Sequence, residues 1–313
     1  MNQEQIEYLM HPRHIHQDIK TQLSKDLEEY VIKAVKGLRK WLEINEWESK
    51  NKRKEYLKSL DLYNLIYEII TTVAIHCQSE LPYISLSSMI SIEGMNKFDS
   101  IKTVSEILAV IEPVGFYQIH QYSSGSRTIE SLIILEEDLL DRLNLSCYLP
   151  PMIEKPNKLY HNKSSGYKII NSDSLILGFK ENHHNKYISL DVLNILNSQE
   201  YEVNLDFISN YERQFHRKEL SPDEMLEEYE LSDFDSYDEF IEQYNQELAN
   251  FELFKEQFKA LLTHVQDKTI YFTHKVDKRG RVYSQGYHFN YQGDSYSKAC
   301  INLKKKELCT GEL

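Results

Sequence analysis

The sequence predicts a mainly α-helical protein with small β elements, an α+β fold. Its 313 residues include only 10 glycines and 7 prolines, fewer than a turn-rich sandwich or barrel needs. Several long stretches repeat hydrophobic residues at three- and four-residue steps, which is the spacing of an amphipathic helix. Runs with the alternation of β-strands are short and few. A hydrophobic fraction of 41% and a charged fraction of 27% are ordinary for a chain that buries a core.

The first segment, residues 1–148, is expected to be a helical domain with one β-hairpin. The hydrophobic periodicity predicts helices over Gln17–Leu60, Leu60–His76 and Ser100–Ile111. Gly115–His120 and Thr128–Leu135 alternate like strands on either side of a Ser-Ser-Gly-Ser turn, which predicts the hairpin. Lys33–Lys58 holds nine basic and four acidic residues, and we interpret it as a solvated helix face with ion pairs.

The second segment, residues 149–266, is expected to combine an extended proline-rich stretch with helices. Pro150 and Pro151 push the residues before them out of the helical region of backbone space. Ser189 and Asn204 are predicted to cap two short helices. A long amphipathic helix is predicted from the hydrophobic stripe Ile241, Tyr244, Leu248, Phe251, Phe254, Phe258, Leu261 and Val265.

An acidic insertion interrupts this second segment. Asp223–Glu247 contains eleven acidic residues and neither Lys nor Arg. Such a composition is typical of a solvated insertion or a partly disordered loop. A role as a decoy for a basic surface is the alternative.

The third segment, residues 267–313, is basic although the whole chain carries a net charge of −13. Nine basic and two acidic residues give Lys268–Lys306 a net charge of +7, which leaves −20 for the rest of the chain. Because local Lys and Arg clusters bind phosphates, this segment is the candidate for nucleic-acid contact. A strand is predicted over Thr269–Thr273.

A tight turn with the sequence DKRGRVY follows that strand. Gly280 permits a positive φ, and Arg279 and Arg281 can each grip a phosphate with two hydrogen bonds. Asp277 can brace one of the arginines, and Tyr283 offers a flat face and a hydroxyl group. The turn at Gln292 and Gly293 and the cation of Lys298 complete the predicted nucleic-acid-binding set, which is Asp277, Arg279, Gly280, Arg281, Tyr283, Gln292, Gly293 and Lys298. The alternative is a β-hairpin whose charges are merely solvated.

Cysteine spacing and hydropathy bear on the compartment. Cys77, Cys147, Cys300 and Cys309 form no CxxC motif and lie in a chain too large for a small disulfide scaffold, so reduced thiols are expected. The most apolar stretch, Leu60–Ile75, contains Asp61, Asn64 and Glu68, and is too polar to span a bilayer. We therefore expect a cytoplasmic protein without a membrane partner.

The order of these motifs resembles the single-subunit RNA polymerases of bacteriophages and mitochondria. The specific match is Asp277, Gly280, Arg281 and Tyr283, followed by Gln292, Gly293 and Lys298. More diffuse similarity covers most of the chain from about residue 60, through Leu149–Pro156, Ser164–Tyr167 and Leu190–Ile208. The resemblance implies an N-terminal domain, thumb-like helices within 149–266 and the start of a palm at 267–313. It also implies that Asp277–Lys298 contacts the template and the RNA–DNA hybrid.

An enzyme of this family also needs two palm carboxylates that hold a pair of Mg²⁺ ions, and a fingers helix that handles the nucleoside triphosphate. In the family these follow well after the D-x-x-G-R element, and Asp294 has no second carboxylate beside it. We therefore expect no catalytic residue and no metal ligand in this chain, and no activity of the chain alone. It resembles the smaller, N-terminal subunit of the two-polypeptide form found in podophages, with a larger subunit supplying palm, fingers, Mg²⁺ and nucleotide chemistry.

This resemblance implies a DNA-directed RNA polymerase subunit in the cytoplasm of an infected host cell, with recruiting factors as further candidate partners. Two alternatives stay open. The chain could be a non-catalytic nucleic-acid-binding remnant or regulator derived from such a polymerase, or a purely structural interaction protein, which would show no salt-dependent binding to nucleic acid.

Overall fold

The computed structural model of the protein describes residues 1–146, 148–179, 184–215, 220–232, 234 and 236–306. Helices dominate and the strands are short, so the predicted mainly α fold with small β elements is confirmed. The chain divides into two compact units. We call Pro12–Leu143 the helical unit, and Met1–His11 with Asn144–Leu313 the composite unit. The predicted division into 1–148, 149–266 and 267–313 stays a prediction.

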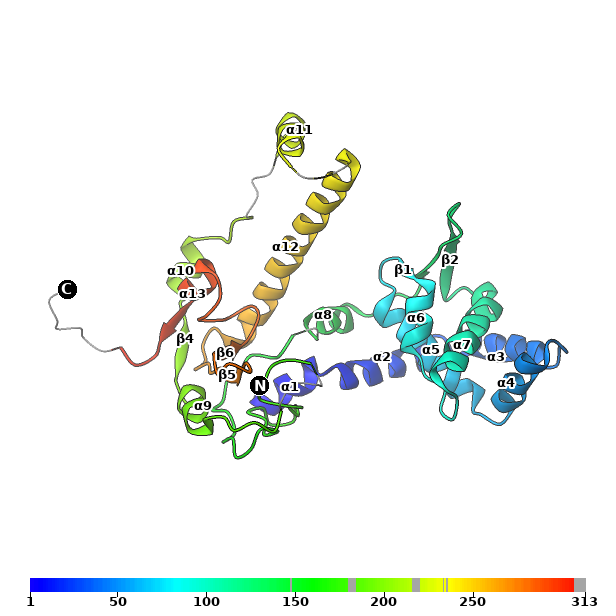
Figure 1. The fold of residues 1–313 in the computed structure, drawn as a ribbon, viewed down its shortest axis with the longest axis horizontal. Helices are drawn as coiled ribbons and strands as arrows, with labels where there is room; N and C mark the ends of the chain where they lie inside the picture. Colours follow the sequence, from blue (N-terminus) through cyan, green and yellow to red (C-terminus); the bar gives the residue numbers. More distant parts are fainter. Residues whose placement is uncertain (147, 180–183, 216–219, 233, 235, 307–313) are drawn as a thin grey trace. The chain divides into compact units, whose positions relative to one another are not determined.

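The helical unit is built mainly of helices (Figure 1), and their buried faces form one hydrophobic core. Its helices are α2 (Pro12–Asp26), α3 (Glu28–Leu42), α4 (Glu48–Lys58), α5 (Leu62–His76), α6 (Tyr83–Met89), α7 (Lys97–Ile111), the 3₁₀ turn η1 (Glu112–Val114) and α8 (Glu137–Leu145), whose end passes into the composite unit. Asp61 caps α5 by accepting from the backbone N–H groups of Tyr63 and Asn64. α5 then buries Ile66, Ile70 and its neighbours between α2 and α3. The predicted helices are present. The predicted stretch Gln17–Leu60 is divided among three of them, namely most of α2 and all of α3 and α4.

The predicted hairpin is present in the helical unit. β2 (Tyr117–Gln121) pairs antiparallel with β3 (Arg127–Ser131), and the short β1 (Leu81–Pro82) adds to the other edge of β3. β3 ends before the predicted Leu135. At its last residue, the backbone N–H of Ser131 donates to the carbonyl of Cys77, and the N–H of the next residue, Leu132, donates to the carbonyl of Phe116.

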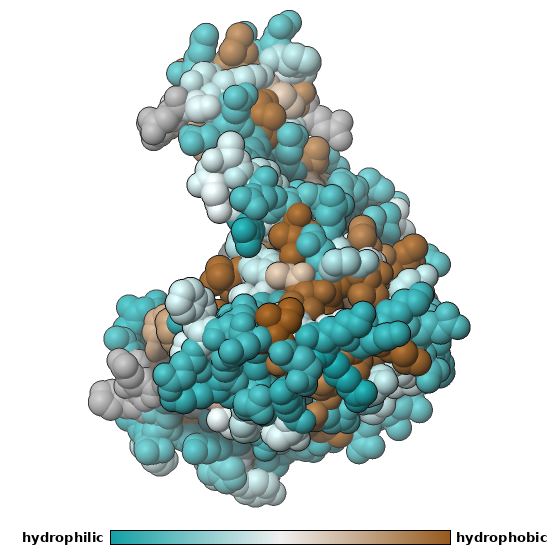
Figure 2. All heavy atoms as spheres, turned by 90° about the vertical axis from the view of Figure 1, so that its right-hand side faces the viewer, coloured by the Kyte–Doolittle hydropathy of each residue, from teal (hydrophilic) through white to brown (hydrophobic). Residues whose placement is uncertain are grey.

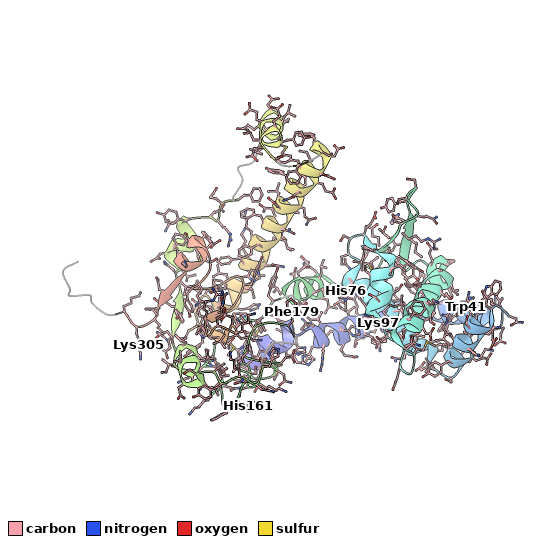
Figure 3. All side chains as sticks on the ribbon, in the orientation of Figure 1. Trp41, His76, Lys97, His161, Phe179 and Lys305 are labelled. Carbon is pink, nitrogen blue, oxygen red and sulfur yellow. The ribbon has the colours of Figure 1, made fainter. Side chains whose placement is uncertain are left out.

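The basic run Lys33–Lys58 forms the predicted ion pairs. Lys50 and Lys54 lie 2.6 and 2.7 Å from the carboxylate of Glu46, and their hydrogen bonds hold its pKa below the usual range. The Lys54 ammonium lies over the ring of Trp41, 4.6 Å from its centroid; Trp41 is labelled in Figure 3. Lys54 is buried rather than solvated, because this carboxylate and ring take the place of water.

Hydrophobic side chains are visible among hydrophilic ones on the face shown in Figure 2. The exposed large hydrophobic residues of the helical unit include Ile44, Trp47, Ile84 and Phe98. Scattered apolar side chains are normal on a protein surface, so they do not by themselves mark a binding site.

The composite unit begins with α1 (Gln3–Met10), which ties together distant parts of the chain. The buried carboxylate of Glu7 accepts the backbone N–H groups of Lys168, Ile169 and Ile170. Gln3 donates to the carbonyl of Pro151 and accepts from the N–H of Ile153. The proline-rich stretch is non-helical, with one bridge from Met152 to Tyr271, and the bonds of Gln3 hold it.

The remaining elements of the composite unit are α9 (Leu190–Asn197), β4 (Tyr201–Val203), α10 (Leu205–Asn210), α11 (Pro222–Glu230), α12 (Tyr237–Val265), β5 (Thr273–Val276), β6 (Val282–Gln285), α13 (Ser295–Ala299) and β7 (Ile301–Leu303). β5 pairs with β6 and β4 with β7, both antiparallel. The C-terminal half of α12 packs Phe254, Phe258 and Leu261 into a core that also includes Phe272 and Phe289. The predicted long helix is therefore confirmed.

Of the two interpretations of Asp223–Glu247, a solvated insertion or a partly disordered loop, the loop is wrong over most of its length. Ser221 and Glu224 form a reciprocal capping box that starts α11, and Ser236 caps α12. α11 lies beside the N-terminal end of α12, so much of the acidic insertion is a pair of helices (Figure 1). Asp233 and Asp235 lie outside the described residues.

The strand before the basic turn is shifted from its predicted place. Thr269–Thr273 was expected to be the strand, but β5 starts at Thr273. Ile270 and Tyr271 instead make isolated bridges to Tyr201 and Met152. These two partners lie beside the segment that precedes β5, whereas β6 pairs only with β5 itself.

Candidate nucleic-acid interface

The turn between β5 and β6 is organised by the carboxylate of Asp277. Its Oδ1 accepts the backbone N–H of Arg279 at 2.9 Å and that of Arg281 at 3.0 Å. The backbone of Asp277 also exchanges hydrogen bonds with Gly280 and Arg281. Gly280 has a φ of +87°, the left-handed conformation that glycine adopts without steric cost. The predicted tight turn is confirmed.

The same carboxylate holds both arginine side chains. Its Oδ2 accepts from Nε of Arg281 at 2.7 Å, from Nε of Arg279 at 3.4 Å and from the hydroxyl of Tyr283 at 3.3 Å. Asp277 was expected to brace one arginine, and the structure shows it contacting two. Because each arginine is held through Nε, its terminal nitrogens are left to contact an anion.

Both arginine side chains of the turn are exposed to solvent, whereas the carboxylate that holds them is mostly buried. The side chains of Arg279 and Arg281 are 66% and 57% exposed, whereas that of Asp277 is only 16% exposed. Burial opposes ionisation of Asp277, but hydrogen bonds from Arg281 and Tyr283 outweigh it and hold its pKa below the usual range. The turn thus presents two guanidinium groups that are oriented by the ionised carboxylate of Asp277.

Gln292 has a different environment from the two arginines. Its amide oxygen accepts the backbone N–H of Ser284 at 2.7 Å, and its amide nitrogen donates to the carbonyl of Val282 at 3.3 Å. The side chain therefore fastens the loop after β6 to that strand. Contact between Gln292 and nucleic acid stays a prediction.

Gly293 and Lys298 lie around the short helix α13. A side chain at Gly293 would come within 2.9 Å of the Cβ of Ser297, so the site requires glycine. Lys298 is exposed on α13. Among the described residues, no hydrogen bond or ion pair links either one to the Asp277 turn.

Asp294 has structural partners in this region. It caps α13 by accepting the N–H of Ser297, and its carboxylate pairs with Arg213. Burial opposes its ionisation, yet the bond from Ser297 and the charge of Arg213 hold its pKa below the usual range. Arg213 was not predicted, because it lies 81 positions away along the chain and no local pattern signals the pairing.

A buried histidine was also missed by the sequence reasoning. His274 on β5 shares hydrogen bonds with Asn197 on α9, at 2.7 Å, and with the hydroxyl of Tyr291, at 2.8 Å. Burial lowers its pKa to about 4. These bonds fix the hairpin that carries the turn. The alternation of side chains along β5 could have indicated that His274 faces inward, opposite to Lys275 and Asp277.

The carboxylates of this turn region do not offer a pair of Mg²⁺ ligands. Asp277 is engaged by two arginines, and Asp294 by Arg213 and the α13 cap. In the described part of the chain one group could hold a metal by geometry, namely Glu80, His120 and Glu130 of the helical unit. Hydrogen bonds from Tyr122 and Thr128 to Glu80 already account for the position of that carboxylate.

Two buried cysteines, Cys77 and Cys300, are free thiols, and burial raises their pKa values to about 12 and about 11. This fits the predicted reduced state for these two, while Cys147 and Cys309 lie outside the described residues. None of the described helices has the length and apolar character needed to cross a membrane.

Comparison with protein-family models and with curated proteins finds no match for this chain. The resemblance to the single-subunit RNA polymerases therefore depends on the motifs quoted above, and it stays a prediction.

Proposed function

We propose that the protein is the N-terminal subunit of a heterodimeric phage DNA-directed RNA polymerase. In this proposal it grips the DNA template and the RNA–DNA hybrid, and it is inactive alone. A larger subunit supplies the palm and fingers, the two Mg²⁺ ions and the site for nucleoside triphosphates. The complex acts in the cytoplasm of the infected host cell.

The observation that carries the proposal is the doubly paired Asp277. A solvated hairpin needs no carboxylate that orients two adjacent guanidinium groups while leaving both exposed. Orientation in advance reduces the side-chain entropy lost on binding, so each guanidinium can contact a phosphate at lower cost. The +7 charge of Lys268–Lys306 within an acidic chain favours the same site.

Other features of the composite unit support a polymerase part. α12 is 29 residues long and precedes the β5–β6 hairpin along the chain, as a thumb-like helix before a palm would. The described carboxylates near the turn are engaged by arginines, which supports placing the metal ligands on the partner subunit. In the reaction this chain's residues hold and orient the strands, and Mg²⁺ on the partner would activate the attacking hydroxyl.

Reconstitution tests the proposal. The chain is co-expressed with the product of a neighbouring reading frame that carries palm-type aspartates, and template-dependent RNA synthesis is measured with Mg²⁺. Synthesis is expected from the complex and from neither chain alone. Failure of any such partner to co-purify, together with salt-dependent nucleic-acid binding by the chain alone, would favour the non-catalytic binding module instead.

Arg281→Ala tests the role of the turn within that complex. Losing a charge-assisted contact costs about 1.5–3 kcal/mol, so RNA extension should fall roughly 10- to 100-fold while the two subunits still co-purify. Arg127→Ala, at an exposed position on β3, is the matched control and should leave extension unchanged. Normal extension by the Arg281 variant would refute the assigned grip.

A further inference from the structure

A cavity of about 140 Å³ with both polar and apolar walls lies in the composite unit beside the β5–β6 hairpin. It has room for several water molecules. Its lining includes Tyr167, Ile170, Asp173, Leu175, Lys275 and Gln285. Nothing in the sequence motifs pointed to it, because its walls come from the segment around residues 164–175 as well as from the hairpin.

The cavity adjoins the hairpin face that carries the turn. Lys275 on β5 is directly opposite Tyr283 on β6, and Thr273 is opposite Gln285. Opposite residues of an antiparallel pair project to the same face, and so do residues two apart on one strand. Lys275 and Tyr283 therefore lie on the same face of the hairpin. On this face the hydroxyl of Tyr283 donates a hydrogen bond to Asp277.

Lys275 is half-buried, and in the described ranges its ammonium has neither a hydrogen bond nor an ion pair within 4.0 Å. Burial lowers its pKa, and the carboxylate of Asp173 only partly offsets this. A half-buried ammonium without a direct partner is costly, and a bound anion would compensate it.

Several other polar groups of the cavity already have partners. The hydroxyl of Ser165 donates to Ile170, and the amide nitrogen of Gln285 donates to the carbonyl of Tyr283. Both ring nitrogens of His274 are hydrogen-bonded. Lys275 is thus the cation that the cavity offers to a ligand.

We propose that this cavity binds one backbone phosphate of the nucleic acid that the Asp277 turn grips, with the Lys275 ammonium as its counter-charge. The inference depends on the proposed function, since it extends the grip along the same hairpin face. A lysine binds phosphate as a point charge, without reading the base sequence. Asp173 lines the same cavity and repels that phosphate, so it moderates the affinity of the site.

Binding of the full chain to an RNA–DNA hybrid duplex, followed by fluorescence anisotropy at several salt concentrations, tests this. Lys275→Gln should weaken binding about three- to tenfold for hybrids of any sequence, and it should reduce the slope of log K against log salt by about 1. Asp173→Asn should tighten binding, because it removes the repulsion. Lys97→Gln, at an exposed position of the helical unit, is the matched control and should change neither quantity.

The outcomes separate this inference from the function it depends on. If Arg281→Ala weakens binding while Lys275→Gln leaves affinity and slope unchanged, the turn holds and the cavity assignment fails. If Asp173→Asn weakens binding and base preference changes, the cavity reads a base edge and the phosphate assignment is wrong. If the unaltered chain does not bind the hybrid, both fail. Asp173 is exposed, so its variant should fold normally even if loss of Lys275 disturbs the hairpin.

Discussion

Gly280 illustrates how a single backbone conformation shapes the candidate site. Its φ of +87° lets the chain reverse within the turn while Asp277 collects the N–H groups of both arginines. The left-handed conformation raises the free energy of a non-glycine residue by about 1–2 kcal/mol, and that of asparagine by the least. The open space around the Gly280 position means that backbone strain, not a steric clash, sets the cost of substitution.

Gly280→Ala should therefore lower the free energy of unfolding by about 1 kcal/mol, and Gly280→Asn by less. Urea unfolding measures both. Equal losses for the two variants would show that the side chain collides with a neighbour instead.

The two buried histidines of the composite unit make stability depend on pH. Burial lowers the pKa of His274 to about 4, and burial with the nearby charge of Arg213 does the same for His288. In the unfolded chain a histidine titrates near 6.5, so the unfolded state takes up protons first as the pH falls. The stabilising contribution is full above about pH 6.5 and is lost progressively down to about pH 4.

Urea unfolding at a series of pH values should show this loss, on the order of 3 kcal/mol for each histidine at full effect. His274→Gln should remove about half of the dependence between pH 6.5 and 4, because His288 still contributes. His161→Gln, at an exposed position labelled in Figure 3, should leave it unchanged. A pH-independent unfolding free energy would contradict the buried, neutral state of His274.

At the scale of elements, α12 depends on its buried stripe more than on helix propensity. Leu261 is 2% exposed in the core of the composite unit, whereas Leu253, two turns earlier, is 38% exposed. Leu→Ala removes the same atoms at both positions and changes helix propensity equally. The difference between the two losses of stability therefore measures the effect of burial.

Leu261→Ala should lower the free energy of unfolding by about 2–5 kcal/mol, because it leaves a cavity in the core. Leu253→Ala should cost less than about 1 kcal/mol, since most of that side chain already contacts water. Urea unfolding midpoints compare the pair, and similar losses would show that the two side chains are buried to the same extent in the protein.

The elements also show what the sequence could and could not predict. Hydrophobic periodicity predicted α5, α7 and α12, and alternation around a turn predicted β2 and β3. Composition misled at Asp223–Glu247, because the Ser221 capping box and burial of Phe240 and Tyr244 favour helices despite the charge. The start of β5 depended on distant bridges to Tyr201 and Met152. In the same way Gln292, Arg213 and Lys275 have environments set by contacts that no local pattern encodes.

For the whole molecule, the two units have separate hydrophobic cores. One core belongs to the helical unit and includes the buried face of α5, and the other includes α12 and the segment before β5. Units with their own cores can unfold independently.

Calorimetry of the full chain should therefore resolve two unfolding transitions. Ile70→Ala, in the first core, should lower only one of them, and Leu261→Ala should lower only the other. A single transition that both variants shift equally would show that the units unfold as one cooperative body.

The bonds of Glu7 to residues 168–170 have a consequence for biosynthesis. The helical unit lies between these two parts of the chain, so it can fold while the ribosome is still translating. α1 emerges before its partners, which follow only after some 160 further residues, on the order of ten seconds later at typical translation rates. During that interval the buried face of α1 is without its native cover, so α1 reaches its final place only after the whole helical unit has been translated.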